Sequence, residues 1–224
     1  MPAVQLRCRI VSQRNREILP IVHIGKDRLE IDGRPISQSQ KIYLMMNKPR
    51  GVVTTASDER GRETVYAHLD KFTSKNSAWV APVGRLDKAS EGLLLLTNDS
   101  EWAARLTAPS THVDKTYHVQ LATQLTATQL QSLELGFTVK DGEFLRVKSA
   151  QLLRQGERNS WVEIILNEGR NRHIRRMFEK LGVEVLRLMR VSIGALKLGE
   201  LPKGTVRELS EKEALLLFTK GTVV

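Results

Sequence analysis

Residues 83–99, VGRLDKASEGLLLLTND, contribute most to the fold prediction. The first half of this stretch is a turn that carries Arg85 and Asp87, and the second half contains four leucines at 93–96. Because the leucines show no polar alternation and have turn residues on both sides, they predict a short strand that is buried on both faces. Asp87 would then lie at the mouth of a rigid element. A carboxylate in that position can serve as a nucleophile, as a base, or only as a turn former.

The sequence around this stretch predicts an α+β domain. Strands are expected at 41–47, 93–97, 116–121, 145–153, 161–166, 185–191 and 205–209, and helices at 99–106, 126–136, 171–181 and 210–218. Strands outnumber helices and lack a regular β-α-β alternation, which favours a mixed, largely antiparallel sheet with flanking helices. Residues 1–40 are polar and basic and end in a turn at 32–35. We therefore expect a short basic N-terminal segment, 1–40, followed by one main domain, 41–224.

Composition excludes several classes of protein. No apolar run approaches the roughly 20 residues that a membrane helix needs, and the start of the chain lacks the apolar core of a secretory signal. The single cysteine, Cys8, excludes a disulfide framework and a cysteine-rich zinc site. The five histidines are scattered, and neither a P-loop nor a dinucleotide-binding glycine motif is present. These observations predict a cytoplasmic protein without a metal site, a nucleotide cofactor or a membrane partner.

Positive charge is concentrated in one part of the chain. The net charge is +10, and residues 170–190 hold seven Arg or Lys against two Glu, a local net charge of +5. Such clustering favours a nucleic-acid partner over an ordinary solvated face.

The expected helix at 171–181 sorts these cations by direction. Its core-facing stripe is formed by apolar residues at helical spacing: Ile174, Met177, Phe178 and Leu181. Arg172 and Arg176 point away from this stripe, whereas Arg175 lies at its border. A border arginine can be partly desolvated and paired with a carboxylate, or it can be a surface residue whose stem covers apolar area. The sequence leaves both interpretations open.

Two motifs together suggest a family: GRLD at 84–87 and EGRNRHIRRM at 168–177. With them, the chain resembles the ribosomal RNA pseudouridine synthases, in the branch that contains the small-subunit enzyme A and the large-subunit enzymes B, E and F. Three further stretches fit in the expected order: NKPRGVVTT at 47–55, DKTY at 114–117 and LRLMRVSIG at 186–194. The resemblance covers about residues 41–218. Most members of this branch begin with an S4-type RNA-binding domain, whereas residues 1–40 resemble only its tail.

The resemblance implies the catalytic fold of these synthases and a defined reaction. A uridine in ribosomal RNA would lose its glycosidic bond, and the rotated uracil would be rejoined through C5, without any cofactor. Asp87 would act on the sugar as a nucleophile or as a base, Tyr117 would lie against the uracil, and Arg175 would pair with the aspartate. RNA contacts are expected from seven basic residues: Lys48, Arg50, Arg85, Arg170, Arg172, Arg176 and Arg190.

We accordingly expect a monomeric cytoplasmic enzyme whose partner is ribosomal RNA. Two alternatives are a non-catalytic RNA-binding protein on the same scaffold and a homologue that acts on transfer or messenger RNA. An organellar location is a further alternative, because residues 1–16 contain four arginines and no acid.

Overall fold

The computed structural model describes residues 8–11, 28–31, 34–36, 40–69, 72 and 79–218. The chain forms two compact units, residues 1–40 and residues 41–224. In the first unit, β1 (Cys8–Val11), β2 (Arg28–Ile31) and β3 (Arg34–Ile36) form an antiparallel sheet in the order β1-β2-β3. Residues 32 and 33, part of the turn expected at 32–35, lie outside the described residues.

The second unit is built on a nine-stranded sheet in the order β10-β11-β7-β12-β6-β4-β14, with β13 beside β12 and β5 beside β6. Its strands are β4 (Tyr43–Lys48), β5 (Ala81–Val83), β6 (Glu91–Thr97), β7 (Lys115–Leu121), β10 (Ser149–Gln155), β11 (Ser160–Leu166), β12 (Val185–Ile193), β13 (Leu196–Lys197) and β14 (Val206–Glu208). Among these strands only β12 and β6 pair in parallel, and the other pairs are antiparallel. The predicted mixed, largely antiparallel sheet is confirmed.

Strand β6 is buried on both faces, as the leucine run predicts. Leu94 and Leu96 belong to one hydrophobic cluster, whereas Leu93 and Leu95 belong to a second cluster on the opposite face. The strand begins at Glu91, two residues before the predicted start. Each face of the sheet at β6 therefore has its own core, and β6 contributes to both.

The early start of β6 depends on Gly92. This residue pairs with Arg190 of β12 and has a φ of +100°. A Cβ at this position would lie 2.3 Å from the backbone oxygen of Arg190, which is far inside van der Waals contact. Only glycine combines this backbone conformation with so close an approach of two chains.

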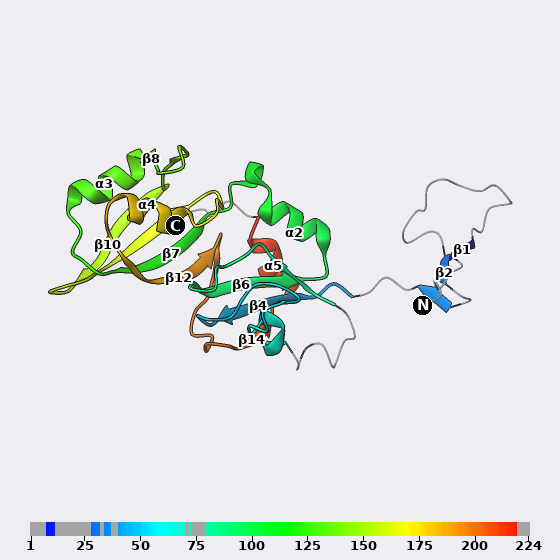
Figure 1. Cartoon of the computed structure of the whole chain (residues 1–224). Coiled ribbons are helices and arrows are strands. Elements are labelled where there is room, and N and C mark those ends of the chain that lie inside the picture. Colours follow the sequence, from blue (N-terminus) through cyan, green and yellow to red (C-terminus); the bar gives the residue numbers. More distant parts are fainter. Residues whose placement is uncertain are drawn as a thin grey trace. The chain divides into compact units, whose positions relative to one another are not determined.

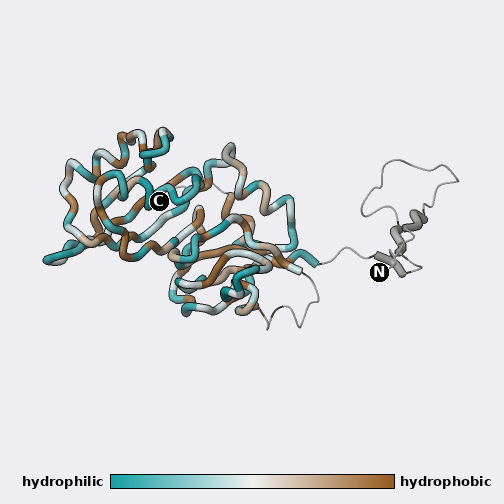
Figure 2. Tube along the Cα trace, in the orientation of Figure 1, coloured by the Kyte–Doolittle hydropathy of each residue, from teal (hydrophilic) through white to brown (hydrophobic). Residues whose placement is uncertain are grey.

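The helices cover the two halves of the sheet separately. They are α2 (Ser100–Thr107), α3 (Ala127–Leu135), α4 (His173–Lys180) and α5 (Glu211–Leu216), with 3-10 turns η1 (Val65–His68) and η2 (Pro109–Thr111). Helices α3 and α4 lie against the half of the sheet that contains β7, β10 and β12, and α2 and α5 lie beside β4 and β6 (Figure 1). Apolar residues gather along the strands between these layers (Figure 2). Helices α3 and α5 begin with capping boxes, at Thr126 and Ser210.

The structure corrects several predicted boundaries. Helix α4 begins at His173 rather than 171, because Arg172 adopts a left-handed conformation (φ 49°) that closes the preceding turn. The strand predicted at 145–153 is divided between β9 (Phe144–Leu145) and β10, and β9 pairs with β8 (Phe137–Thr138) in a separate hairpin. Within the described residues, no helix is long and apolar enough to cross a membrane.

Candidate active site

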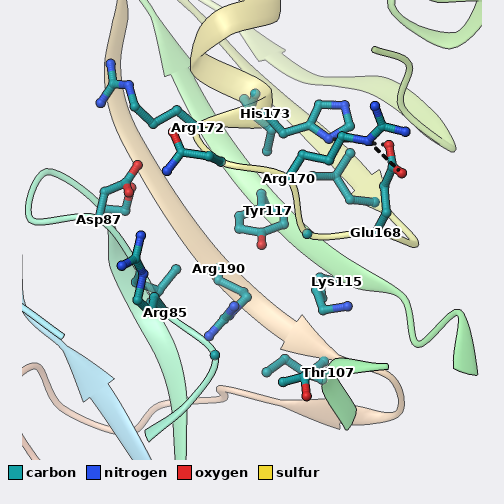
Figure 3. Close-up of a pocket in the computed structure, with 18 of the residues that line it drawn as sticks. Arg85, Asp87, Thr107, Lys115, Tyr117, Glu168, Arg170, Arg172, His173 and Arg190 are labelled. Carbon is teal, nitrogen blue, oxygen red and sulfur yellow. Dashed lines mark hydrogen bonds and ion pairs between the residues drawn. The ribbon is translucent and has the colours of Figure 1, made fainter. Parts of the chain in front are cut away.

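A cavity of about 660 Å³ opens where three parts of the main unit meet. The turn between β5 and β6 contributes Asp87 and Arg85, β7 contributes Tyr117, and the segment before α4 contributes Arg172 (Figure 3). These residues are far apart in the sequence, and the sheet brings them to one place. A volume of this size suits a ligand as large as a nucleotide.

The turn that carries Asp87 is held by its backbone. The carbonyl of Leu86 accepts a hydrogen bond from the Thr54 hydroxyl at 2.8 Å, and the carbonyl of Asp87 accepts one from the Ser90 amide at 2.9 Å. The Asp87 carboxylate itself is half-buried, and no hydrogen bond or ion pair to it exists within the described residues. The backbone is therefore fixed, while the functional group is available to a ligand.

Lys48 holds the same turn from within the protein. Its side chain is fully buried, and its ammonium group donates to three backbone carbonyls, those of Pro49, Asp87 and Ser90, at 3.1, 3.2 and 2.9 Å. Burial lowers the pKa of this ammonium from 10.5 to about 8, although Asp87 and Glu91 act in the opposite direction. This position contradicts the predicted phosphate contact, because RNA cannot reach a side chain that is enclosed by the turn that carries Asp87.

Arg175 also binds the turn, but not in the predicted way. Its guanidinium donates to the carbonyl of Ala89 at 2.9 Å and to that of Val185 at 3.3 Å. Within the described residues it makes no ion pair with Asp87, so the expected direct pairing is absent. Burial lowers the pKa of Arg175, Arg172 lowers it further, and the charge of Asp87 opposes both. Arg175 is thus the partly desolvated border arginine. It is linked to Asp87 by its hydrogen bond to the backbone of the same turn and by the attraction between the two charges, without direct contact.

Tyr117 and Arg190 are direct neighbours in the sheet. Tyr117 on β7 pairs with Arg190 on β12, and both side chains are buried and line the cavity. The Arg190 side chain is only 4% exposed, and its Nε donates to the carbonyl of Leu93 at 2.7 Å. Arg190 therefore lies on the cavity floor and not on the surface, where a phosphate contact was expected.

Comparison with known proteins identifies the family. Residues 42–180 match the family described as RNA pseudouridylate synthase. The chain belongs to the RNA pseudouridylate synthase family. It is 36% identical over 190 residues to the ribosomal large subunit pseudouridine synthase B of Bacillus subtilis (strain 168), covering 84% of this chain and 76% of that protein. A protein of the same name from Haemophilus influenzae is 40% identical, with 84% and 53% covered.

Solved structures agree with this assignment. One described as a pseudouridylate synthase superimposes with a TM-score of 0.69 at 30% identity, covering 94% of this chain and 88% of that one. An H/ACA RNP bound to a substrate RNA containing 2′-deoxyuridine aligns with a TM-score of 0.54 at 16% identity, a likeness of fold alone. The resemblance to pseudouridine synthases and the expected fold are confirmed.

Five of the arginines that were expected to contact RNA differ in how strongly other residues of this synthase bind them. Arg85 and Arg172 line the cavity mouth, and the guanidinium of neither has a hydrogen-bonded or ionic partner in the described part of the chain. Arg50 is exposed and donates to the carbonyl of Leu186 at 3.2 Å. Arg170 and Arg176, by contrast, are bound by carboxylates: Arg170 by Glu168 (3.0 Å) and Glu143 (2.6 Å), and Arg176 by Asp141 (2.5 Å) and Glu143 (2.6 Å). Lys48, Arg50, Arg175 and Arg176 lie outside the lining of the cavity.

Lys115 is a lining residue that the sequence interpretation missed. It lies two positions before Tyr117 on β7 and faces the same cavity. The alternation of β7 was visible in the sequence, so the period of two could have placed Lys115 beside Tyr117. No cluster of three or more His, Cys, Asp or Glu side chains that could hold a metal ion occurs in the described residues.

Proposed function

We propose that the protein converts one uridine of ribosomal RNA to pseudouridine, as a monomer in the cytoplasm. The observation that carries this proposal is the Asp87 carboxylate, which has no partner among the described residues. It lies on a firmly held turn at a nucleotide-sized cavity that Tyr117 also lines. The names of two relatives, both ribosomal large subunit synthases, favour the large-subunit RNA as substrate. The reaction is an isomerisation in which substrate and product have the same composition, so its balance requires no external oxidant, reductant or group donor.

The chemistry divides into three steps. The target base must first leave its stack and enter the cavity. The N1–C1′ bond then breaks, and its electron pair leaves with the uracil, while Asp87 either attacks C1′ or takes a proton from the sugar. Finally the uracil turns and C5 bonds to C1′. This step either displaces the Asp87 carboxylate from C1′ or is accompanied by return of the proton that Asp87 took from the sugar. The proton that C5 loses is balanced by one gained at N1. Tyr117 offers its ring face to the uracil during this rotation.

Arg175 is a positioning residue in this scheme. Its hydrogen bond to the Ala89 carbonyl holds the turn two residues beyond Asp87. Its positive charge also lies near Asp87, whose charge opposes the lowering of the Arg175 pKa.

RNA contacts fall into two groups. Arg85 and Arg172 are free to bind phosphates at the mouth of the cavity, and Arg50 retains donors for the same purpose. Arg170 and Arg176 must first exchange their bonds to Glu143 for bonds to phosphate. Lys48 and Arg190, which were also expected to contact RNA, are buried and are not proposed as phosphate ligands.

The test is pseudouridine mapping in large-subunit, small-subunit and transfer RNA from cells that lack the gene, before and after incubation with the purified protein. The wild-type protein should create one new pseudouridine, in large-subunit RNA. Asp87→Asn should create none while binding the same RNA within about threefold of wild type. Full activity of Asp87→Ala would exclude the proposed role of Asp87. RNA binding without any new pseudouridine would instead support the non-catalytic alternative.

A further inference from the structure

Two cations lie side by side at the cavity floor, and neither is neutralised there. Lys115 and Arg190 flank Tyr117, the first two positions away on β7 and the second directly across on β12. In the view of Figure 3, the hydroxyl end of Tyr117 points to the side of the cavity where Lys115 and Arg190 lie. Of the two carboxylates in the cavity lining, Glu168 is bound to Arg170, and Asp87 has no ionic partner within the described residues.

The bonds that these two side chains make are too few to satisfy them. The Arg190 Nη2 is buried and has no hydrogen-bond partner among the described residues, although Nε of the same side chain donates to the Leu93 carbonyl. Within the same residues, the Lys115 ammonium donates only to the carbonyl of Val113, at 3.0 Å. Asp114, the acid next to it in the sequence, is bound to Lys148 at 2.6 Å instead. A buried guanidinium nitrogen without an acceptor is costly unless a ligand supplies one.

The electrostatics of Lys115 agree with this arrangement. Burial lowers the pKa of the Lys115 ammonium, Arg190 lowers it further, and Asp114 only partly compensates. The floor therefore repels a further cation and attracts an anion.

We propose that Lys115 and Arg190 stabilise the uracil anion that forms when the glycosidic bond breaks. This inference rests on the proposed isomerase function and adds two catalytic residues to it. When the N1–C1′ bond breaks, its electron pair remains on uracil and spreads from N1 onto the oxygens O2 and O4. A ring stacked on Tyr117 presents its edge to residue 115, about 7 Å along the strand, and to residue 190, about 5 Å across it. Preorganised donors in a water-poor site stabilise such developing charge strongly.

The same cations could in principle hold a phosphate of the target nucleotide. Their depth argues for the base instead, because Arg190 is 96% buried, whereas the exposed Arg85 and Arg172 already offer phosphate sites at the mouth. A phosphate ligand would be held equally before and after bond breakage and would contribute to binding. A uracil anion exists only after bond breakage, so its stabilisation would appear in the rate.

The experiment separates these outcomes with charge-removing and charge-retaining variants. Lys115→Met, Arg190→Gln, Lys115→Arg and the control Lys212→Met, an exposed charge on α5, are compared with wild type on the RNA that the wild type modifies. The single-turnover rate at saturating enzyme, the RNA Kd and the thermal unfolding midpoint are measured for each. We expect Lys115→Met and Arg190→Gln to lose on the order of 10²-fold or more in rate. Their Kd should stay within about threefold of wild type, Lys115→Arg should recover most of the rate, and Lys212→Met should match wild type.

A second substrate tests whether the lost charge acted on the leaving base. Fluorine at C5 withdraws electrons and makes the uracil anion intrinsically more stable, so an RNA with 5-fluorouridine at the target depends less on the cations. The ratio of wild-type to variant rates, followed as loss of 5-fluorouridine, should therefore be smaller than for uridine.

Three results would overturn the inference. The first is a weaker Kd with an unchanged rate in Lys115→Met and Arg190→Gln, as expected for phosphate binding. The second is an equal ratio of wild-type to variant rates for uridine and 5-fluorouridine, together with no recovery of the rate in Lys115→Arg. The third is an unchanged rate in both Lys115→Met and Arg190→Gln. If Arg190→Gln does not fold, Lys115→Met carries the test, because it gives up only the bond to Val113. A wild-type protein that modifies no RNA would contradict the proposed function itself, which is a distinct result.

Discussion

The ammonium group of Lys48 lies 3.2 Å from the backbone carbonyl oxygen of Asp87, beneath the turn whose carboxylate faces the cavity. A cation is thus placed behind the turn that carries Asp87, with no access to solvent, and three carbonyls from two segments converge on it. The arrangement fixes the turn without occupying the carboxylate.

Removal of Lys48 should destabilise the protein. In Lys48→Met the three carbonyls lose their shared donor while remaining buried, and we expect a loss of about 3 kcal/mol in the free energy of unfolding. Urea unfolding measures this value, and Lys212→Met should stay within about 0.5 kcal/mol of wild type. Equal stability of Lys48→Met and wild type would show that the carbonyls find other partners.

The stability contribution of Lys48 should depend on pH. Burial lowers its pKa from 10.5 to about 8 in the folded protein. Between these values the unfolded chain keeps the proton and the folded protein does not, so the stability of wild type relative to Lys48→Met should rise as pH increases. Below about pH 8 the difference should be constant, because both states are protonated. Unfolding at pH 7 and pH 10 checks the sign, and a difference that falls toward pH 10 contradicts it.

The isomerisation rate should fall as pH increases, whereas the stability of wild type relative to Lys48→Met should rise. A neutral Lys48 amine has only two N–H donors for three carbonyls, so the turn that carries Asp87 is held less firmly. We expect the single-turnover rate of wild type to fall above about pH 8. In Lys48→Met the rate should be lower than that of wild type at every pH, and the fall above about pH 8 should be absent.

Gly92 should tolerate no side chain. In Gly92→Ala the new Cβ would lie 2.3 Å from the Arg190 oxygen and 2.9 Å from its nitrogen, both backbone atoms. We expect a loss of about 3 kcal/mol or more, because β6 and β12 must separate. Gly61→Ala is the matched control, since Gly61 also has a positive φ (+64°) but nothing within 4 Å of its Cβ position. It should lose only about 1–2 kcal/mol, so similar losses at both positions would exclude the close approach as the cause.

Arg175 should affect the rate and not the binding of RNA. Lysine cannot bridge the carbonyls of Ala89 and Val185 as the guanidinium does. A turn displaced in this way should reduce the single-turnover rate of Arg175→Lys on the order of 10²-fold, with Kd nearly unchanged. Arg176→Gln, one position along the helix, should weaken RNA binding and leave the single-turnover rate nearly unchanged. A large change in Kd for Arg175→Lys would indicate direct contact with RNA.

Salt dependence should distinguish the free arginines from the engaged ones. Arg85→Gln and Arg172→Gln should each reduce the slope of log K against log salt by about 1, because each removes one phosphate contact. Arg176→Gln should reduce it less, since Arg176 gives up its bonds to Asp141 and Glu143 when it binds phosphate. Equal slopes for the three variants would mean that the carboxylates do not compete.

Local pattern predicted most strands of the main sheet and part of the site, but not the short strands β5 and β13. The leucines at 93–96 predicted β6 because a strand buried on both faces has no polar alternation, and the motifs around Asp87 and Tyr117 placed both residues at one cavity. Lys48 and Arg190 were misplaced because a charged residue is normally exposed. Apart from the Pro49 carbonyl, which is next to Lys48 in the sequence, their carbonyl partners come from segments more than 38 positions away, and no local pattern encodes them. The hydrogen bond from Arg175 to the Ala89 carbonyl could not be predicted for the same reason, because 86 positions separate the two residues.

The parallel contact between β6 and β12 has a mechanical consequence. The two strands are in register at only two residue pairs, Met189 with Glu91 and Arg190 with Gly92, whereas the antiparallel ladders on either side are longer. Bending of the sheet should concentrate where the fewest backbone bonds cross it. Asp87 precedes β6 and Tyr117 lies on β7 beyond β12, so this line passes between them. The width of the cavity is therefore coupled to the angle between the two halves of the sheet. Any change in that angle must also repack the hydrophobic cluster that Leu94 of β6 shares with Leu188 of β12.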